Sequence, residues 1–167
     1  MKKIFFLMAF MMGTSVLAKP LEPIGTYGDW TAYIYQDETN KICYIAAEPE
    51  KSEGKYKKRD DVFLMVAHRP TEKKFDEVSA IAGYTYKRGS KPSLTVDKKR
   101  GIMMVSRDNT AWGHDKATDV RLVQQMKEGS KIVLVGTSTR GTKTTDTFSL
   151  KGFTKAYDEI TQACGNK

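Results

Sequence analysis

The C-terminal segment from Lys131 to Cys164 places the tightest limits on the fold, because its apolar pattern changes from that of strands to that of a helix. An apolar run, Ile132 to Val135, ends at Gly136 and is followed by a polar turn. Beyond the turn, Phe148 and Leu150 alternate with polar residues, which is typical of a strand with one buried face. Apolar residues then recur at helical spacing, at Phe153, Ala156, Tyr157, Ile160 and Cys164. The segment therefore predicts two paired strands followed by a short helix that presents a cysteine.

Short strand-like runs, separated by turn residues, occupy most of the remaining chain. They are 28–36, 42–47, 62–67, 77–86, 93–96 and 102–105. Helical periodicity outside the C-terminus is weak and predicts one or two turns within Asp119 to Met126. The charged segment Glu48 to Asp61 has no apolar period, so we expect a long exposed loop or a poorly ordered excursion. About eight or nine strands with little helix indicate one all-β domain, a sandwich or a barrel, over residues 19–167.

The first eighteen residues have the features of a secretory signal peptide. Two lysines precede an apolar run from Ile4 to Met12, and the small residues Val16 and Ala18 precede Lys19. We therefore expect cleavage between Ala18 and Lys19, and export of the chain. A membrane span would need about 20 apolar residues, and no later segment is long or apolar enough to form one. The mature protein is thus expected in the periplasm, at the cell surface or in the medium.

The chain has two cysteines, Cys43 and Cys164, and both remain after cleavage of the signal peptide. In an oxidising compartment, two cysteines favour one disulfide. This bond would join an early strand to the final helix. A redox role is disfavoured, because the two cysteines do not form a C-x-x-C pair.

Basic residues outnumber acidic ones, and the formal charge of +8 becomes +6 when the two lysines of the signal peptide are removed. The basic residues form short clusters between strand-like runs, which indicates loops. They either keep a β protein soluble or contact an anionic partner at a glycan or membrane surface. Export and the lack of a recognisable motif disfavour nucleic acid. The candidate contact surface consists of Lys57, Lys58, Arg59, Lys98, Lys99 and Arg100.

No arrangement of residues predicts catalysis, a metal or a cofactor. His68 and His114 are far apart in the sequence and have no nearby ligand pair, so we expect polar strand-end histidines. Gly136 to Arg140 resembles a nucleophile elbow only superficially, because it lacks the second glycine and connects two strands. Aromatic residues could line a carbohydrate-binding surface, but a β core is the commoner use of them. Two arginines beside apolar strands, Arg69 and Arg140, would need partners such as Asp29 or Asp146 if they were buried.

Taken in order along the chain, a set of short motifs resembles the invasion-associated locus B family of exported bacterial proteins. The motifs are Gly28-Asp29-Trp30, Cys43-Tyr44, Gly83-Tyr84 with Tyr86-Lys87, Ala111-Trp112, Met126-Lys127-x-Gly129, Gly136-Thr137-Ser138-x-Arg140-Gly141-Thr142, Asp146-Thr147-Phe148-Ser149-Leu150-x-Gly152-Phe153 and Cys164. The resemblance covers nearly the whole mature chain, and its C-terminal block is the most specific part. It implies an immunoglobulin-like β-sandwich with a C-terminal helix, and a role in host-cell entry, chiefly erythrocyte invasion. It supplies no catalytic residues.

We therefore expect an exported, non-enzymatic envelope protein that supports host-cell invasion through contacts with a surface protein or glycan, or with anionic envelope components. The alternative is a periplasmic housekeeping module, a chaperone or a hydrolase inhibitor, that maintains envelope integrity. A phenotype under envelope stress in the absence of host cells would favour this alternative.

Overall fold

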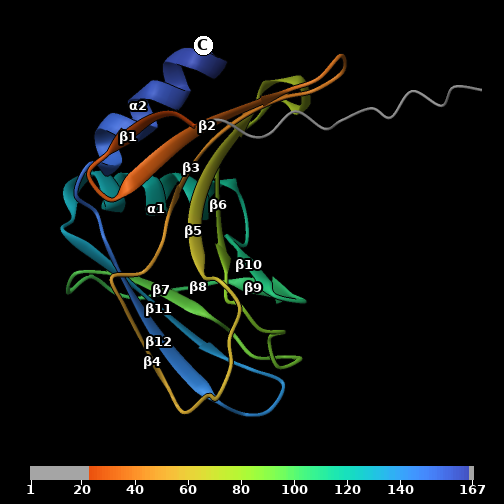
Figure 1. The fold of residues 1–167 in the computed structure, drawn as a ribbon, viewed down its shortest axis with the longest axis vertical. Helices are drawn as coiled ribbons and strands as arrows, with labels where there is room; N and C mark the ends of the chain where they lie inside the picture. Colours follow the sequence, from red (N-terminus) through yellow and green to blue (C-terminus); the bar gives the residue numbers. More distant parts are fainter. Residues whose placement is uncertain (1–22, 166–167) are drawn as a thin grey trace, which may run out of the picture.

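The computed structural model describes residues 23–165, which form two antiparallel sheets and two α-helices (Figure 1). The seven-stranded sheet contains, in spatial order, β1 (Pro23–Tyr27), β2 (Trp30–Gln36), β3 (Lys41–Ala47), β5 (Phe63–Arg69), β6 (Lys74–Ile81), β10 (Thr110–Trp112) and β9 (Val105–Arg107). The five-stranded sheet contains β4 (Lys51–Gly54), β12 (Lys143–Ser149), β11 (Lys131–Thr137), β7 (Ser93–Val96) and β8 (Ile102–Met103). The helices are α1 (Lys116–Glu128), α2 (Phe153–Cys164) and a short 3₁₀ turn, η1 (Pro70–Glu72).

These elements confirm the predicted all-β sandwich with a C-terminal helix. The predicted signal peptide, with its cleavage site between Ala18 and Lys19, lies outside the described residues. Within residues 23–165, neither helix has the length and apolar character that crossing a bilayer requires.

One core lies between the seven-stranded sheet and the layer that covers its inner face. Figure 1 shows α2 at the top of this layer, α1 below it, and the five-stranded sheet at the bottom. All of these elements contribute fully buried side chains to the same apolar cluster, including Leu64 from β5, Leu122 from α1, Phe148 from β12 and Ile160 from α2. Burial of side chains of this size is worth about 1.5–3 kcal/mol each relative to exposure.

The start of β2 contacts the chain that joins β12 to α2 through hydrogen bonds to backbone carbonyls. The Asp29 N–H donates to the Lys151 carbonyl at 3.0 Å, and the indole N–H of the fully buried Trp30 donates to the Ser149 carbonyl at 3.0 Å. Gly152 has φ +88°, and a Cβ there would lie 1.9 Å from the Tyr27 carbonyl oxygen. Only glycine accepts both the left-handed conformation and this close approach. Two of the motifs noted in the sequence therefore meet here for structural reasons.

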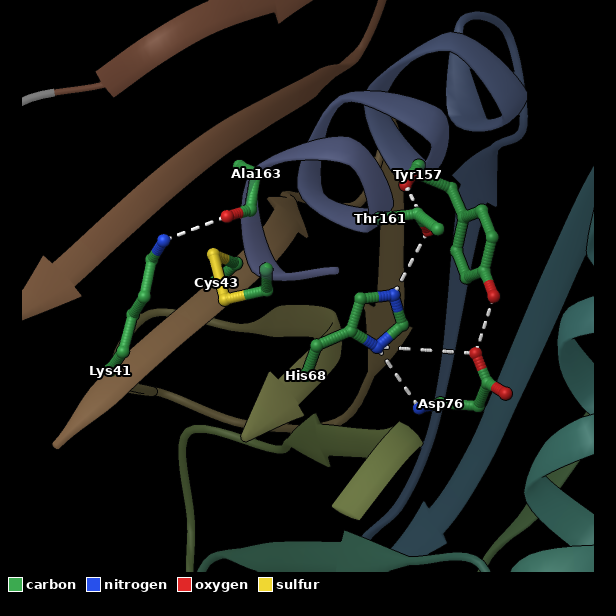
Figure 2. The surroundings of a disulfide bond; sticks show 8 residues. Lys41, Cys43, His68, Asp76, Tyr157, Thr161 and Ala163 are labelled. Atoms are coloured by element: carbon green, nitrogen blue, oxygen red, sulfur yellow. Dashed lines mark hydrogen bonds and ion pairs between the residues drawn. A yellow bond between two sulfur atoms is a disulfide. The ribbon is translucent and has the colours of Figure 1, made fainter. Parts of the chain in front are cut away.

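Helix α2 buries the five residues that the sequence predicts as its apolar face. At its C-terminus Gly165 adopts φ +59°, and its N–H donates to the Thr161 carbonyl at 2.9 Å. The Lys41 ammonium donates to the Ala163 carbonyl at 2.7 Å (Figure 2), which satisfies another carbonyl of the last turn with a positive charge.

The predicted disulfide between Cys43 and Cys164 is confirmed. It joins β3 to the end of α2, with the two Cα atoms 5.9 Å apart and the cysteines separated by 121 positions. Both cysteines are buried. The bond therefore fixes α2 on the inner face of the seven-stranded sheet.

Local differences from the sequence predictions have simple causes. The described residues contain twelve strands, more than the eight or nine predicted. Several strands have only two to four residues, which is too few for a visible alternation in the sequence. Helix α1 has 13 residues, with the Asp115 carboxylate accepting from the Thr118 N–H at 2.8 Å as its N-cap. Gly136 does not end its strand but pairs with Thr144 inside the β11–β12 hairpin.

The disulfide gives the first testable prediction. A cross-link of this span removes conformational entropy from the unfolded chain worth about 4–5 kcal/mol. We expect the Cys43→Ala/Cys164→Ala variant to show a lower urea midpoint, with a free energy of unfolding reduced by up to this amount. A reductant should lower the midpoint of the wild type and leave the double variant unchanged. Equal midpoints for the two proteins without reductant would contradict the prediction.

Candidate binding groove

Arg59, which belongs to the loop after β4, points into the protein rather than toward solvent. Its Nη1 and Nη2 atoms donate to Asp146 Oδ1 and Oδ2 at 2.6 and 2.7 Å, and its Nε donates to the Ala82 carbonyl at 2.6 Å. The Asp146 side chain is fully buried, and that of Arg59 is 5% exposed. This is a bidentate, charge-assisted pair shielded from water. Burial, the largest single effect, lowers the pKa of the guanidinium, but the hydrogen bonds and the charge of Asp146 together with Tyr56 and Tyr84 outweigh it, so the net shift is upward.

Two tyrosines enclose the Arg59 guanidinium. Its Cζ lies 5.4 Å from the ring centroid of Tyr56 and 4.9 Å from that of Tyr84, within the range of cation–π attraction. The Tyr84 hydroxyl forms a 2.7 Å hydrogen bond with Thr144 Oγ1. A Cβ at Gly136 would lie 2.5 Å from the Tyr84 hydroxyl oxygen, so the close packing of this ring requires a glycine in β11.

The loop is also bound to the chain that follows β6. The Asp60 N–H donates to the Gly83 carbonyl at 3.1 Å. Gly83 adopts φ +67°, and a Cβ there would lie 2.1 Å from the Asp60 carbonyl oxygen. Three more of the sequence motifs thus meet around Arg59, through Gly83-Tyr84, Gly136 and Asp146. They fix the loop that follows β4.

A groove of about 510 Å³ lies above this ion pair, and we call it the basic groove. Its walls are residues 55–60, residues 83–85, Thr144 and the turn between β11 and β12. In Figure 1 these segments lie together at the bottom of the molecule, at the end opposite α2. Besides Arg59, four cationic side chains line the groove, all exposed and, among residues 23–165, in no ion pair: Lys55, Lys57, Lys58 and Arg140.

The structure divides the six residues of the predicted contact surface into three groups. Lys57 and Lys58 line the basic groove. The prediction that Arg59 belongs to the contact surface is wrong, because its charge is buried against Asp146 and cannot serve as a free surface contact. Lys98, Lys99 and Arg100 are exposed in the turn after β7, beside the start of β11, and Lys99 pairs with Glu128 at 2.8 Å. The seven-residue length of β11, about 20 Å, separates this turn from the groove.

The partners of the other flagged arginines also differ from expectation. Asp146 is the buried acid, but its partner is Arg59. Arg69 is half-exposed and pairs with Glu77 at 2.7 Å, whereas Arg140 is exposed in the groove. The alternation of β12 contains a signal for the first finding, since Asp146 lies two residues before Phe148 and shares its buried face. Nothing in the charged loop distinguishes Arg59 from the lysines beside it.

His68 is fully buried beneath α2, in a network that sequence reasoning missed (Figure 2). Its Nδ1 accepts from the Asp76 backbone N–H at 3.1 Å. The proton of the neutral ring therefore lies on Nε2, which donates to Thr161 Oγ1 at 3.1 Å, and Thr161 donates to the Tyr157 carbonyl. The Tyr157 hydroxyl donates to the Asp76 carboxylate. A hydroxyl, an imidazole and a carboxylate thus lie in the order of a catalytic triad, but the Asp76 carboxylate is 4.0 Å from Nδ1.

This network cannot act as a catalytic triad in the geometry observed. A general base needs a free lone pair on the nitrogen that faces the hydroxyl, and here that nitrogen carries the proton. The ring is also closed to solvent. Among residues 23–165, no three His, Cys, Asp or Glu side chains are grouped so that they could hold a metal ion. What the hydrogen bonds of the network do is join α2 to β5 and β6.

Two titratable groups, the fully buried His68 and the half-buried Asp119, give opposite dependences of stability on pH. Burial lowers the pKa of His68, although Asp76 opposes the shift, so the unfolded chain takes up a proton first and stability falls as pH drops below about 6.5. Burial raises the pKa of Asp119 to about 6, although the Val78 N–H opposes the shift. The folded state therefore binds a proton first at Asp119, and stability rises as pH falls through about 6.

The buried ion pair gives a prediction about stability. Asp146→Ala leaves the Arg59 charge buried without a partner, which should lower the free energy of unfolding by about 3–5 kcal/mol. The Arg59→Met/Asp146→Leu variant removes both charges and should recover most of that loss. Lys99→Ala, which breaks an exposed pair, should cost at most about 1 kcal/mol. Urea unfolding measures all three, and an Asp146→Ala cost no larger than that of Lys99→Ala would contradict the assignment.

Comparison with known proteins agrees with the motifs that meet in this structure. A family model described as "Invasion associated locus B (IalB) protein" matches residues 30–161, which is most of the chain. No curated protein and no solved structure gives a significant match. The matched range includes Trp30 and all the walls of the basic groove. The chain belongs to the invasion associated locus B family.

Proposed function

We propose that this protein is an exported, non-enzymatic binding module of the bacterial envelope, and that it supports host-cell invasion, including entry into erythrocytes, through the basic groove. Family membership supports a general role associated with invasion. The Cys43–Cys164 disulfide is compatible with export, because such bonds persist in oxidising compartments. The observation that carries the proposal is a cluster of unpaired cations on a groove whose wall is held in place by the Arg59–Asp146 ion pair.

The ion pair explains why the groove suits binding. Arg59 is neutralised by Asp146 and contributes no free charge, yet it holds the rings and the loop in place. The cations at the rim are therefore presented by an ordered backbone, which reduces the entropy lost when a partner binds. The four exposed cations outnumber the one exposed acidic residue of the lining, Asp60, so the groove attracts an anionic partner from a distance of about 8–10 Å at physiological salt.

Charge reversal in bacteria tests this proposal with a matched control. The groove variant is Lys57→Glu/Lys58→Glu/Arg140→Glu, and the control variant is Lys98→Glu/Lys99→Glu/Arg100→Glu, which changes the net charge equally at the far end of β11. Arg59 is left intact, because its loss alone would leave the Asp146 charge buried without a partner. We expect the groove variant to attach to erythrocytes several-fold less than wild type, and the control variant to attach normally. Both purified proteins should melt close to the wild-type temperature, since all six residues are exposed.

Normal attachment of the groove variant would contradict the proposal, and so would an equal loss in both variants. If attachment is unaffected while a deletion strain fails under envelope stress without host cells, the housekeeping alternative replaces it.

A further inference from the structure

The chemistry of the basic groove restricts the kind of partner it can hold. This inference rests on the proposed function and identifies the ligand class of the same groove. The cationic side chains of the groove come from two separate segments, with Lys57 and Lys58 in the loop after β4 and Arg140 in the β11–β12 turn. A ligand that meets both segments must carry more than one negative charge along its length.

Aromatic surface lies between these charges. Tyr56 is 38% exposed and is the one large exposed apolar side chain of residues 23–165 that lines the groove. The Arg59 guanidinium lies 5.4 Å from the centroid of its ring and restrains it. An exposed, oriented tyrosine presents an apolar surface and a hydrogen-bonding hydroxyl at low entropic cost. The apolar face of a sugar ring fits such a surface.

Hydroxyl groups complete the lining. Thr139 is exposed and Thr142 half-exposed in the β11–β12 turn, and both line the groove. Hydroxyl side chains both donate and accept hydrogen bonds, as the hydroxyls of a sugar do. A membrane surface would require exposed apolar side chains at the same place, but Met103, Val105 and Val120 lie on β8, β9 and α1, outside the groove lining.

We propose that the basic groove binds an acidic oligosaccharide. Its sulfate or carboxylate groups contact Lys57, Lys58 and Arg140, and one of its sugar rings packs on Tyr56. The guanidinium of Arg140 can hold an oxyanion with two parallel hydrogen bonds, whereas the lysines act as point charges. The Arg59–Asp146 pair takes no direct part but positions the Tyr56 ring.

Calorimetric titration of the purified mature protein with a heparin hexasaccharide tests this assignment. We expect binding that weakens as salt rises, because the charges are exposed. The groove variant should lose at least about tenfold in affinity, equivalent to about 1.4 kcal/mol, and the control variant should keep wild-type affinity. Tyr56→Ala should also weaken binding several-fold, while Tyr56→Phe retains the ring and most of the affinity. A desulfated heparin hexasaccharide, which keeps its carboxylates, shows whether sulfate or carboxylate is the group that is bound.

Several outcomes would overturn the assignment. Tripolyphosphate that binds as tightly as the hexasaccharide, with no effect of Tyr56→Ala, would show a site for anions without sugar recognition. Tighter binding of a single-stranded oligonucleotide would assign the groove to nucleic acid. Equal losses in the groove and control variants, or no binding of either hexasaccharide, would remove the saccharide proposal. The proposed function would still stand in that last case if erythrocyte attachment depends on the groove, since its partner would then be of another chemical class.

Discussion

Arg59 and Asp146 form an ion pair from which water is almost excluded, and the path of the loop that precedes β5 depends on it. Asp146 is held at a fully buried position of β12, so its charge needs a cation that comes to it. The loop supplies Arg59, and with it Tyr56 and the lysines at 55, 57 and 58 are brought to the end of the β11–β12 hairpin. A single buried carboxylate thus determines where a set of surface charges lies.

The contacts that close the core and the exposed unpaired charges lie at opposite ends of the molecule. At the α2 end, the disulfide, the Trp30 contacts and the His68 network join the C-terminal helix to the first sheet. At the other end, the backbone is fixed by one ion pair and by close glycine contacts, while the lysines and Arg140 remain exposed. Because the helix end closes the core, the groove end can keep unpaired charges that do not contribute to folding.

Periodicity predicted the parts of this structure that bury one apolar face. The C-terminal hairpin and the buried face of α2 follow from residue spacing, and the Cys43–Cys164 bond follows from the expectation of an oxidising compartment. Strands β4 and β10 were too short to show alternation, and β1 begins at a proline. The predicted strand 102–105 is divided between β8 and β9, which belong to different sheets. Arg59 could not be identified as buried, because its need for a partner arises from Asp146, 87 positions away. The groove likewise combines three distant segments, which only the tertiary structure places together.

The central claim is that the basic groove meets a partner outside the cell, and protease treatment of intact bacteria tests it most directly. The lysines of residues 55–58 are exposed trypsin sites in the groove itself. We expect trypsin to cut the mature protein on intact cells, or the protein to be found in the medium, while a periplasmic marker stays whole. If the protein resists trypsin until the outer membrane is permeabilised, and none is released, the groove does not reach a host cell and the claim is wrong.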